Sequence, residues 1–200
     1  MMSQRELLLA ALALIALSLG GCGGRSPDVT FYTLSTLPPG SSPAAAPGIA
    51  LAVGPTEFPR TLSRTQIVTR SGPNQLEIDE YHRWAEPLHH GFLRAVGENL
   101  GSLLQTERVA IYPADALFPV DLRVVLDVQR FDGSRDGTVT LQARWTLLTG
   151  STNEAIAVEQ FSTDKPVGDD SYDALVRAHS AAVEELSRAI AARIRATPTP

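Results

Sequence analysis

The sequence predicts an α+β fold in which an antiparallel or mixed sheet is covered mainly on one face by two amphipathic helices. Apolar residues alternate with polar ones through segments 122–128 and 139–147, as they do in strands that bury one face. Apolar residues recur every three or four positions through 88–104 and 171–196, as they do on the buried side of a helix. The two periodicities together indicate a sheet with helices packed against it.

The first 21 residues have the pattern of a secretory signal peptide. Arg5 supplies a positive charge, and the apolar run 7–19 that follows is shorter than the roughly 20 residues needed to span a bilayer. Cys22, the only cysteine of the chain, follows a pair of glycines directly. This arrangement resembles a bacterial lipobox, which implies that Cys22 is lipidated and becomes the new N-terminus. The alternative is an ordinary cleavage site with an incidental cysteine.

Lipidation of Cys22 has consequences for location and stability. Several acyl chains hold a protein at a membrane, since each buried methylene contributes about 0.8 kcal/mol. Gly23 stands where an aspartate commonly marks inner-membrane retention, so we expect the periplasmic side of the outer membrane. With its only thiol consumed, the mature chain forms no internal disulfide and depends on packing.

The remaining chain has the length of one domain. Residues 22–47 are predicted to hold the lipidated start, a short strand and an exposed tether rich in Pro, Ala and Ser. Residues 48–196 are predicted to form a single α+β domain, and residues 197–200 a tail. The net charge of −5 is spread along the chain, without the basic patch that nucleic-acid binding requires.

The first half of the domain is predicted to alternate strands with one helix. The helix is expected over 88–104, with Pro87 at its start, and its glycines indicate close approach to a neighbouring element. The strands are expected at 29–34, 48–58, 66–70, 75–79 and 109–112, with a Ser-Gly-Pro-Asn turn between the third and the fourth.

The second half is predicted to be a meander followed by a long helix. Strands 122–128 and 139–147 flank a turn at 132–137, and a third strand follows at 155–162 with a bulge near Glu159. Trp145 is in phase with the buried face and is assigned to the core. Asp170 or Ser171 is expected to cap the helix over 171–196.

Five segments together resemble a known family. They are Phe31-Tyr32-Thr33-Leu34, Arg64-Thr65-Gln66-Ile67-Val68, Tyr81-His82-Arg83-Trp84-Ala85-Glu86-Pro87-Leu88, Arg130-Phe131-Asp132-Gly133 and Ala143-Arg144-Trp145. The chain thereby resembles the ABC-type transport auxiliary lipoproteins, the PqiC/YmbA-like family. The resemblance implies a non-catalytic, lipid-anchored accessory subunit of an MCE-type intermembrane lipid transport system. Its implied partners are an MCE-domain periplasmic protein and an ABC permease and ATPase. The lipid anchor adds the membrane as a partner, and the sequence leaves a homo-oligomer open.

The sequence contains no motif for catalysis, metal binding or a cofactor. It has no Gly-x-Ser-x-Gly elbow, no His-Glu-x-x-His pair and no phosphate-binding loop. His89 and His90 point about 100° apart on a helix, so they are poorly placed to share one ion. The turn-like aspartates are interpreted as capping and turn residues; they are Asp132, Asp136, Asp169 and Asp170.

Tyr81, Arg83 and Trp84 are the candidate partner contacts, because Tyr, Arg and Trp dominate interface hot spots. For Trp84, plain packing is the competing interpretation. Two other functions remain open from the residues: a lipoprotein that carries a hydrophobic ligand in its own cavity, and a structural lipoprotein of the cell envelope.

Overall fold

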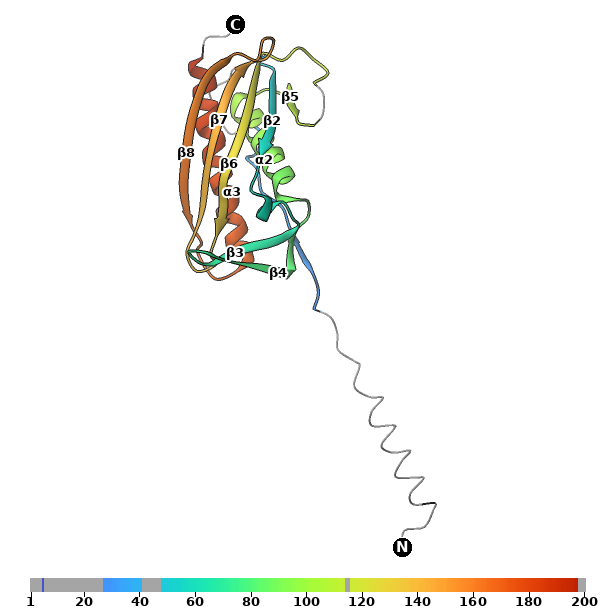
Figure 1. Cartoon of the computed structure of the whole chain (residues 1–200). Helices are drawn as coiled ribbons and strands as arrows, with labels where there is room; N and C mark the ends of the chain where they lie inside the picture. Colours follow the sequence, from blue (N-terminus) through green and yellow to red (C-terminus); the bar gives the residue numbers. More distant parts are fainter. Residues whose placement is uncertain (1–4, 6–26, 41–47, 114–115, 198–200) are drawn as a thin grey trace.

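The computed structural model describes residue 5 and residues 27–40, 48–113 and 116–197. Cys22, most of the predicted signal peptide and residues 41–47 of the predicted tether lie outside these residues. The described chain has the predicted α+β fold, built from two helices and two sheets (Figure 1).

The larger sheet is mixed and has five strands, in the order β5-β2-β6-β7-β8. Strand β2 runs parallel to both of its neighbours, whereas β6, β7 and β8 form an antiparallel meander. The strands are β2 (Leu51–Glu57), β5 (Val109–Ile111), β6 (Leu122–Gly133), β7 (Thr138–Thr149) and β8 (Ala155–Pro166).

The smaller sheet has three strands, in the order β1-β4-β3. The predicted hairpin is present as β3 (Gln66–Gly72) and β4 (Gln75–Trp84), preceded by the short 3-10 helix η1 (Arg60–Leu62). Strand β1 (Thr30–Tyr32) pairs in parallel with β4. The sequence predicts one sheet; the structure has two, because β1, β3 and β4 pair only with one another and not with a strand of the larger sheet.

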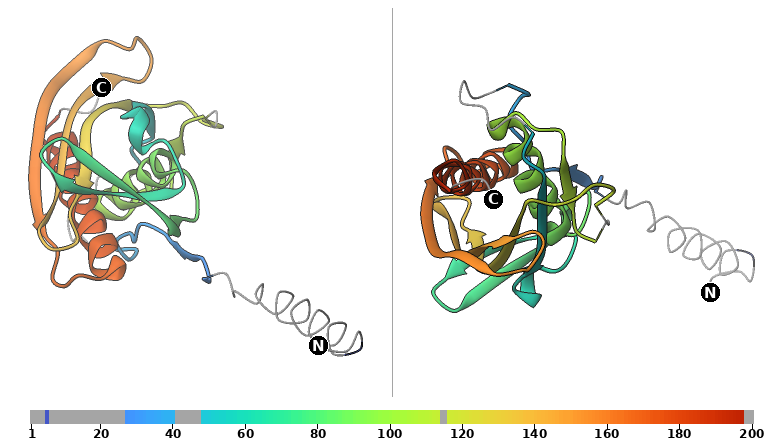
Figure 2. Two further views of the ribbon diagram at one scale, coloured as in Figure 1. Left: turned by 60° about the horizontal axis from the view of Figure 1, so that its bottom comes forward. Right: turned by 90° about the horizontal axis from the view of Figure 1, so that it is seen from above.

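Two helices cover one side of the larger sheet (Figure 2). Helix α2 (Leu88–Leu104) lies near β2 and β5, and α3 (Tyr172–Ala196) packs on β6, β7 and β8 and against α2. Ser171 caps α3, since its side chain accepts a hydrogen bond from the Ala174 amide at 3.1 Å. Within the described part of the chain, neither helix is long and apolar enough to cross a membrane.

The meander strands are longer than the sequence predicts, and one aspartate expected in a turn therefore lies in a strand. The pairing of β6 with β7 continues to Gly133 opposite Val139, so Asp132 belongs to a strand and not to a turn. The irregularity expected near Glu159 lies instead at Ile156, because Glu159 pairs regularly with Trp145. An extra residue in one strand changes which side chains face inward beyond it.

The core lies between the larger sheet and the helices. Trp145 is 1% exposed, as predicted, and fills this space together with Phe92 and Phe131. The close approach predicted for the helical glycines occurs at Gly97, where an added Cβ would lie 2.7 Å from Cδ1 of Ile111. A larger residue there would require the Ile111 side chain or α2 to shift.

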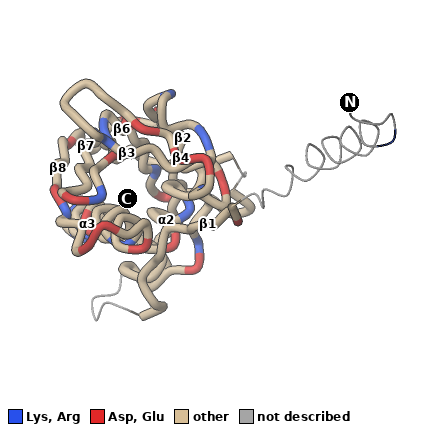
Figure 3. The backbone as a smooth tube through the Cα atoms, turned by 90° about the horizontal axis from the view of Figure 1, so that it is seen from below, with Lys and Arg blue, Asp and Glu red and all other residues tan. Residues whose placement is uncertain are grey.

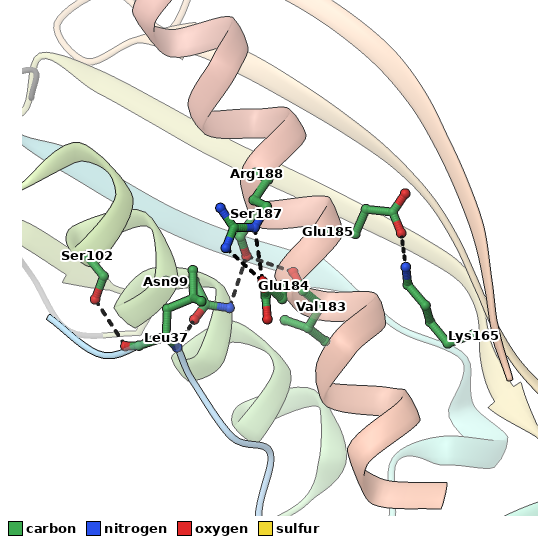
Figure 4. A network of polar contacts seen from close by, with 9 residues as sticks. All are labelled: Leu37, Asn99, Ser102, Lys165, Val183, Glu184, Glu185, Ser187 and Arg188. Atoms are coloured by element: carbon green, nitrogen blue, oxygen red, sulfur yellow. Dashed lines mark hydrogen bonds and ion pairs between the residues drawn. The ribbon is translucent and has the colours of Figure 1, made fainter. Parts of the chain in front are cut away.

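The segment after β1 is hydrogen-bonded to both helices, and Figure 4 shows its contacts with α2, where Leu37 meets Asn99 and Ser102. The Leu37 amide donates to Asn99 Oδ1 of α2 at 2.7 Å, and the Ser35 amide donates to Ser180 Oγ of α3 at 3.0 Å. Asn99 is buried and reaches Ser187 of α3. Residues 35–37, predicted as part of an exposed tether, are therefore held on the domain by hydrogen bonds from their backbone.

Candidate partner-binding site

The three predicted contact residues lie at the end of β4, in the smaller sheet. In the parallel pairing with β1, Phe31 lies opposite Arg83 and Tyr32 opposite Trp84. Because successive side chains of a strand point to opposite faces, Trp84 faces away from Arg83 and Tyr81. The sheet therefore divides the predicted set between two faces.

Trp84 lies on the inner face and is a core residue. It is 4% exposed, and its ring meets the ring of His179 edge to face at 5.5 Å. Of the two interpretations of Trp84, a partner contact or packing in the core, its position in the structure fits packing in the core. Tyr81 and Arg83 remain at the surface, with 44% of Tyr81 and 34% of the Arg83 side chain exposed.

A turn centred on Asp79 orients this end of β4. Its Oδ1 accepts hydrogen bonds from the backbone amides of Tyr81 at 2.7 Å and His82 at 2.6 Å. Its Oδ2 accepts the hydroxyl hydrogen of Tyr172, at the start of α3, at 2.8 Å. Burial acts to raise the pKa of Asp79, but these hydrogen bonds outweigh burial and lower the pKa to about 2.

An aromatic stack fills the space between β4, β1 and α3. The rings of His82 and Tyr172 are stacked with centroids 3.8 Å apart, and the ring of Tyr32 lies beside this pair, 6.0 Å from His82 and 6.4 Å from Tyr172. Burial and the Asp79 carboxylate raise the pKa of Tyr172 to about 12, so its hydroxyl stays a donor. The stack anchors the smaller sheet to α3. Sequence reasoning missed it, since Tyr172 fits an ordinary helical stripe.

In the described domain, the two titratable residues whose side chains are buried as a whole, Asp132 and His179, both have structural partners. Asp132 accepts hydrogen bonds from Arg70 of β3 and Arg130 of β6 at 2.7 to 3.1 Å, which joins the two sheets. Although burial acts to raise the pKa of Asp132, these arginines hold it below its usual value. His179 is 2% exposed, and burial lowers its pKa to about 4, so it is neutral. Its Nδ1 lies 2.8 Å from the Leu175 carbonyl.

No metal centre is apparent in the described segments, where no three His, Cys, Asp or Glu side chains are grouped to hold an ion. The rings of His89 and His90 have centroids 4.0 Å apart. Nδ1 of His89 is buried without a hydrogen-bond partner, and burial and the neighbouring His90 lower the pKa of His89. The pair lacks a third ligand.

Two of the hollows on the surface of the described domain have the volume of a small-molecule site. A mainly apolar groove of about 720 Å³ runs between α2, β5 and residues 36–40, lined among others by Leu37, Val109 and Ile111. A polar hollow of about 550 Å³ lies at the tips of the β3–β4 and β6–β7 hairpins, where Arg70 and Arg130 are already engaged by Asp132. The groove is the candidate site for an apolar ligand.

Comparison with known proteins defines the class of this chain. Residues 32–191 match the family model of the ABC-type transport auxiliary lipoprotein component. The chain belongs to this family, as its motifs indicate. No curated protein sequence matches it.

Solved structures share the fold. Protein XCC0632 from Xanthomonas campestris superposes with a TM-score of 0.69 at 18% identity, covering 83% of this chain and 94% of its own. An uncharacterized protein superposes with a TM-score of 0.69 at 21% identity, covering 84% of this chain and 99% of its own. At these identities the likeness extends to the fold alone.

Proposed function

We propose that this chain is a non-enzymatic, lipid-anchored accessory subunit of an MCE-type intermembrane lipid transport system. The observation that carries the proposal is the family match over residues 32–191, preceded in the sequence by the lipobox-like Cys22. Its partners are an MCE-domain periplasmic protein and the associated ABC permease and ATPase. The chain docks their periplasmic assembly at the outer membrane, held there by acyl chains such as palmitate on Cys22.

The use of the titratable groups supports a non-enzymatic role. Catalytic acids and bases need a perturbed pKa together with access to a substrate. In the described domain, the groups with the clearest perturbations are engaged in structural contacts. Asp79 fixes a turn, Asp132 joins two sheets, and His179 is enclosed in the core.

We infer that anchoring lowers the affinity that the domain itself must have for its partner. A covalent tether converts partner binding at the membrane into a local event with a high effective concentration. The surface of the domain needs only modest affinity for the MCE assembly. Of the three predicted contact residues, Tyr81 and Arg83 are exposed on the smaller sheet and are proposed to make contacts at the membrane end of the domain.

The experiment is affinity purification of the full chain from bacterial membranes. The lipidated chain should co-purify with an MCE-domain protein and an ABC permease. Cys22→Ser should release the chain from membranes or leave it unprocessed, whereas Ser26→Ala, four residues further on, should change neither. Normal maturation and membrane retention of Cys22→Ser would exclude the lipid anchor. Purification without an MCE protein would count against the adaptor role.

The apolar groove beside α2 favours a second candidate function, that of a carrier of a hydrophobic ligand. Its volume of about 720 Å³ falls in the range of small-molecule sites. The interior between the sheet and the helices is filled by side chains such as Trp145, so a ligand would have to bind in this surface groove. Native mass spectrometry of the purified full chain separates the two functions, because stoichiometric non-covalent lipid is expected only for the carrier.

A further inference from the structure

We propose that the outer face of the smaller sheet contacts the headgroup region of a phospholipid bilayer and orients the domain there. This outer face consists of Val29, Phe31, Tyr81 and Arg83. The inference rests on the lipidation of Cys22 proposed above. It adds a second, non-covalent contact with the same membrane.

The strand register groups these four residues. Phe31 lies opposite Arg83 in the parallel pairing of β1 and β4. Val29 and Tyr81 precede them by two positions each and are both exposed, whereas the ring of His82, between Tyr81 and Arg83, stacks on Tyr172 on the inner side. Their neighbours in the alternation, Tyr32 and Trp84, face the core. The four side chains therefore belong to one continuous outward surface.

The outer face is unusually apolar for a free surface. Phe31 is 62%, Tyr81 44% and Val29 40% exposed. Of the seven exposed large hydrophobic residues in the described chain, three belong to this outer face. Clustered apolar exposure of this kind marks an interaction surface, whereas single exposed residues need no explanation.

The position of the anchor selects the bilayer as the partner. The described chain reaches β1 from residue 27, at the end of the molecule formed by β1, β3 and β4 (Figure 1). Only six residues separate Cys22 from Val29. Seven steps of extended chain span at most about 25 Å, so an acylated Cys22 keeps Val29 within that distance of the membrane surface. The short spacer gives the outer face a high effective concentration at the bilayer.

The residue types fit an interfacial position. Tyr has an apolar ring and a polar hydroxyl, and Arg has an apolar stem and a charged head, so both are stable where hydrocarbon meets water. Arg83 is already engaged, since its Nε donates to the Glu80 carbonyl at 3.0 Å and its Nη2 lies 3.7 Å from the Glu80 carboxylate. Acidic and basic residues are interspersed over this end of the molecule (Figure 3). We therefore expect contact through the aromatic rings, with little dependence on anionic lipid.

The test measures depth with a nitroxide on a single introduced cysteine. Once Cys22 is acylated, the chain has no other thiol, so Tyr81→Cys and Phe31→Cys can each be labelled alone. Val158→Cys on β8 is the matched control, because Val158 is 60% exposed on the larger sheet. The lipidated full chain is reconstituted in vesicles of phosphatidylethanolamine and phosphatidylglycerol, and collisions with oxygen and with a water-soluble nickel chelate are compared.

The ratio of oxygen collisions to nickel-chelate collisions should be several-fold higher for labels at positions 81 and 31 than for the label at position 158. The preference should persist in vesicles without phosphatidylglycerol and in 0.5 M salt, about where the Debye length falls below 5 Å. Equal ratios at all three positions would overturn the inference. So would protection of positions 81 and 31 from both probes, or dipolar broadening between labels, because these results identify a protein or a second copy on this face.

Mass analysis of the same samples separates the two proposals. A diacylated or triacylated Cys22 with water-exposed labels would refute the bilayer contact alone. An unmodified Cys22 would refute the anchor and the inference that rests on it. A Phe31→Ser, Tyr81→Ser double variant should keep its acyl chains and its far-UV circular dichroism spectrum. A label on Val29→Cys in that background should lose the oxygen preference.

Discussion

Acidification should destabilise the domain through His179. The imidazole is 2% exposed, between the rings of Trp84 and Phe131, and burial lowers its pKa from 6.5 to about 4. The unfolded chain therefore binds a proton below pH 6.5 that the folded chain does not accept until about pH 4. The stability that neutral His179 contributes is present above pH 6.5 and is lost as the pH falls toward 4.

The magnitude follows from the two pKa values. Each pKa unit corresponds to 1.36 kcal/mol, so the full loss is about 3 kcal/mol below pH 4 and about 2 kcal/mol at pH 5. A domain of this kind has a total stability of roughly 5 to 15 kcal/mol. The loss at pH 5 is therefore a substantial fraction of the whole.

Urea unfolding at pH 7 and pH 5 measures the effect. The parent chain is compared with His179→Gln, which does not titrate and keeps a donor for the Leu175 carbonyl, and with His90→Gln as a control at an exposed histidine. The parent and the His90 variant should lose about 2 kcal/mol more between these pH values than the His179 variant. An equal loss in all three proteins would refute the assignment of His179 as the buried neutral group.

Three further substitutions test the packing of the two sheets and helices. Asp132→Asn should lower the free energy of unfolding by about 3 kcal/mol, because it leaves Arg70 without its buried charged partner. A urea midpoint that falls by less than a tenth of the parent midpoint would contradict this. Gly97→Ala should cost about 1 to 3 kcal/mol by overpacking, and the additional change Ile111→Ala should recover part of the loss in thermal melting if the contact is the cause. Ser171→Ala should cost about 1 kcal/mol by removing the cap of α3, and Ser171→Asp should restore it in the same assay.

Local periodicity predicted the elements well because helices and strands have different repeats. The helices over 88–104 and 171–196 were expected within a residue or two of α2 and α3. The meander was also expected, since its strands are neighbours in sequence and are joined by turns. The ends of these strands were not predicted, because β6 and β7 continue pairing to Gly133, beyond the last clear alternation of apolar and polar residues.

The candidate contact residues show where local reasoning ends. Tyr81, Arg83 and Trp84 lie within four consecutive positions, and all three are residue types that are enriched in interface hot spots. Which of them faces the core depends on the pairing of β4 with β1 and on the turn held by Asp79. Both depend on residues far along the chain, including Tyr172, which no local pattern connects to β4.

The amino-acid sequence by itself determined the fold class, the family and the expected anchor at Cys22, because each depends on short-range patterns or on recognisable motifs. Only the tertiary structure decided that there are two sheets, that Trp84 is buried, and that Phe31 and Tyr81 share an exposed face. The physical reason is that strand pairing between distant segments sets which side of each strand meets the core. A shift of one residue in that pairing would exchange the two sides.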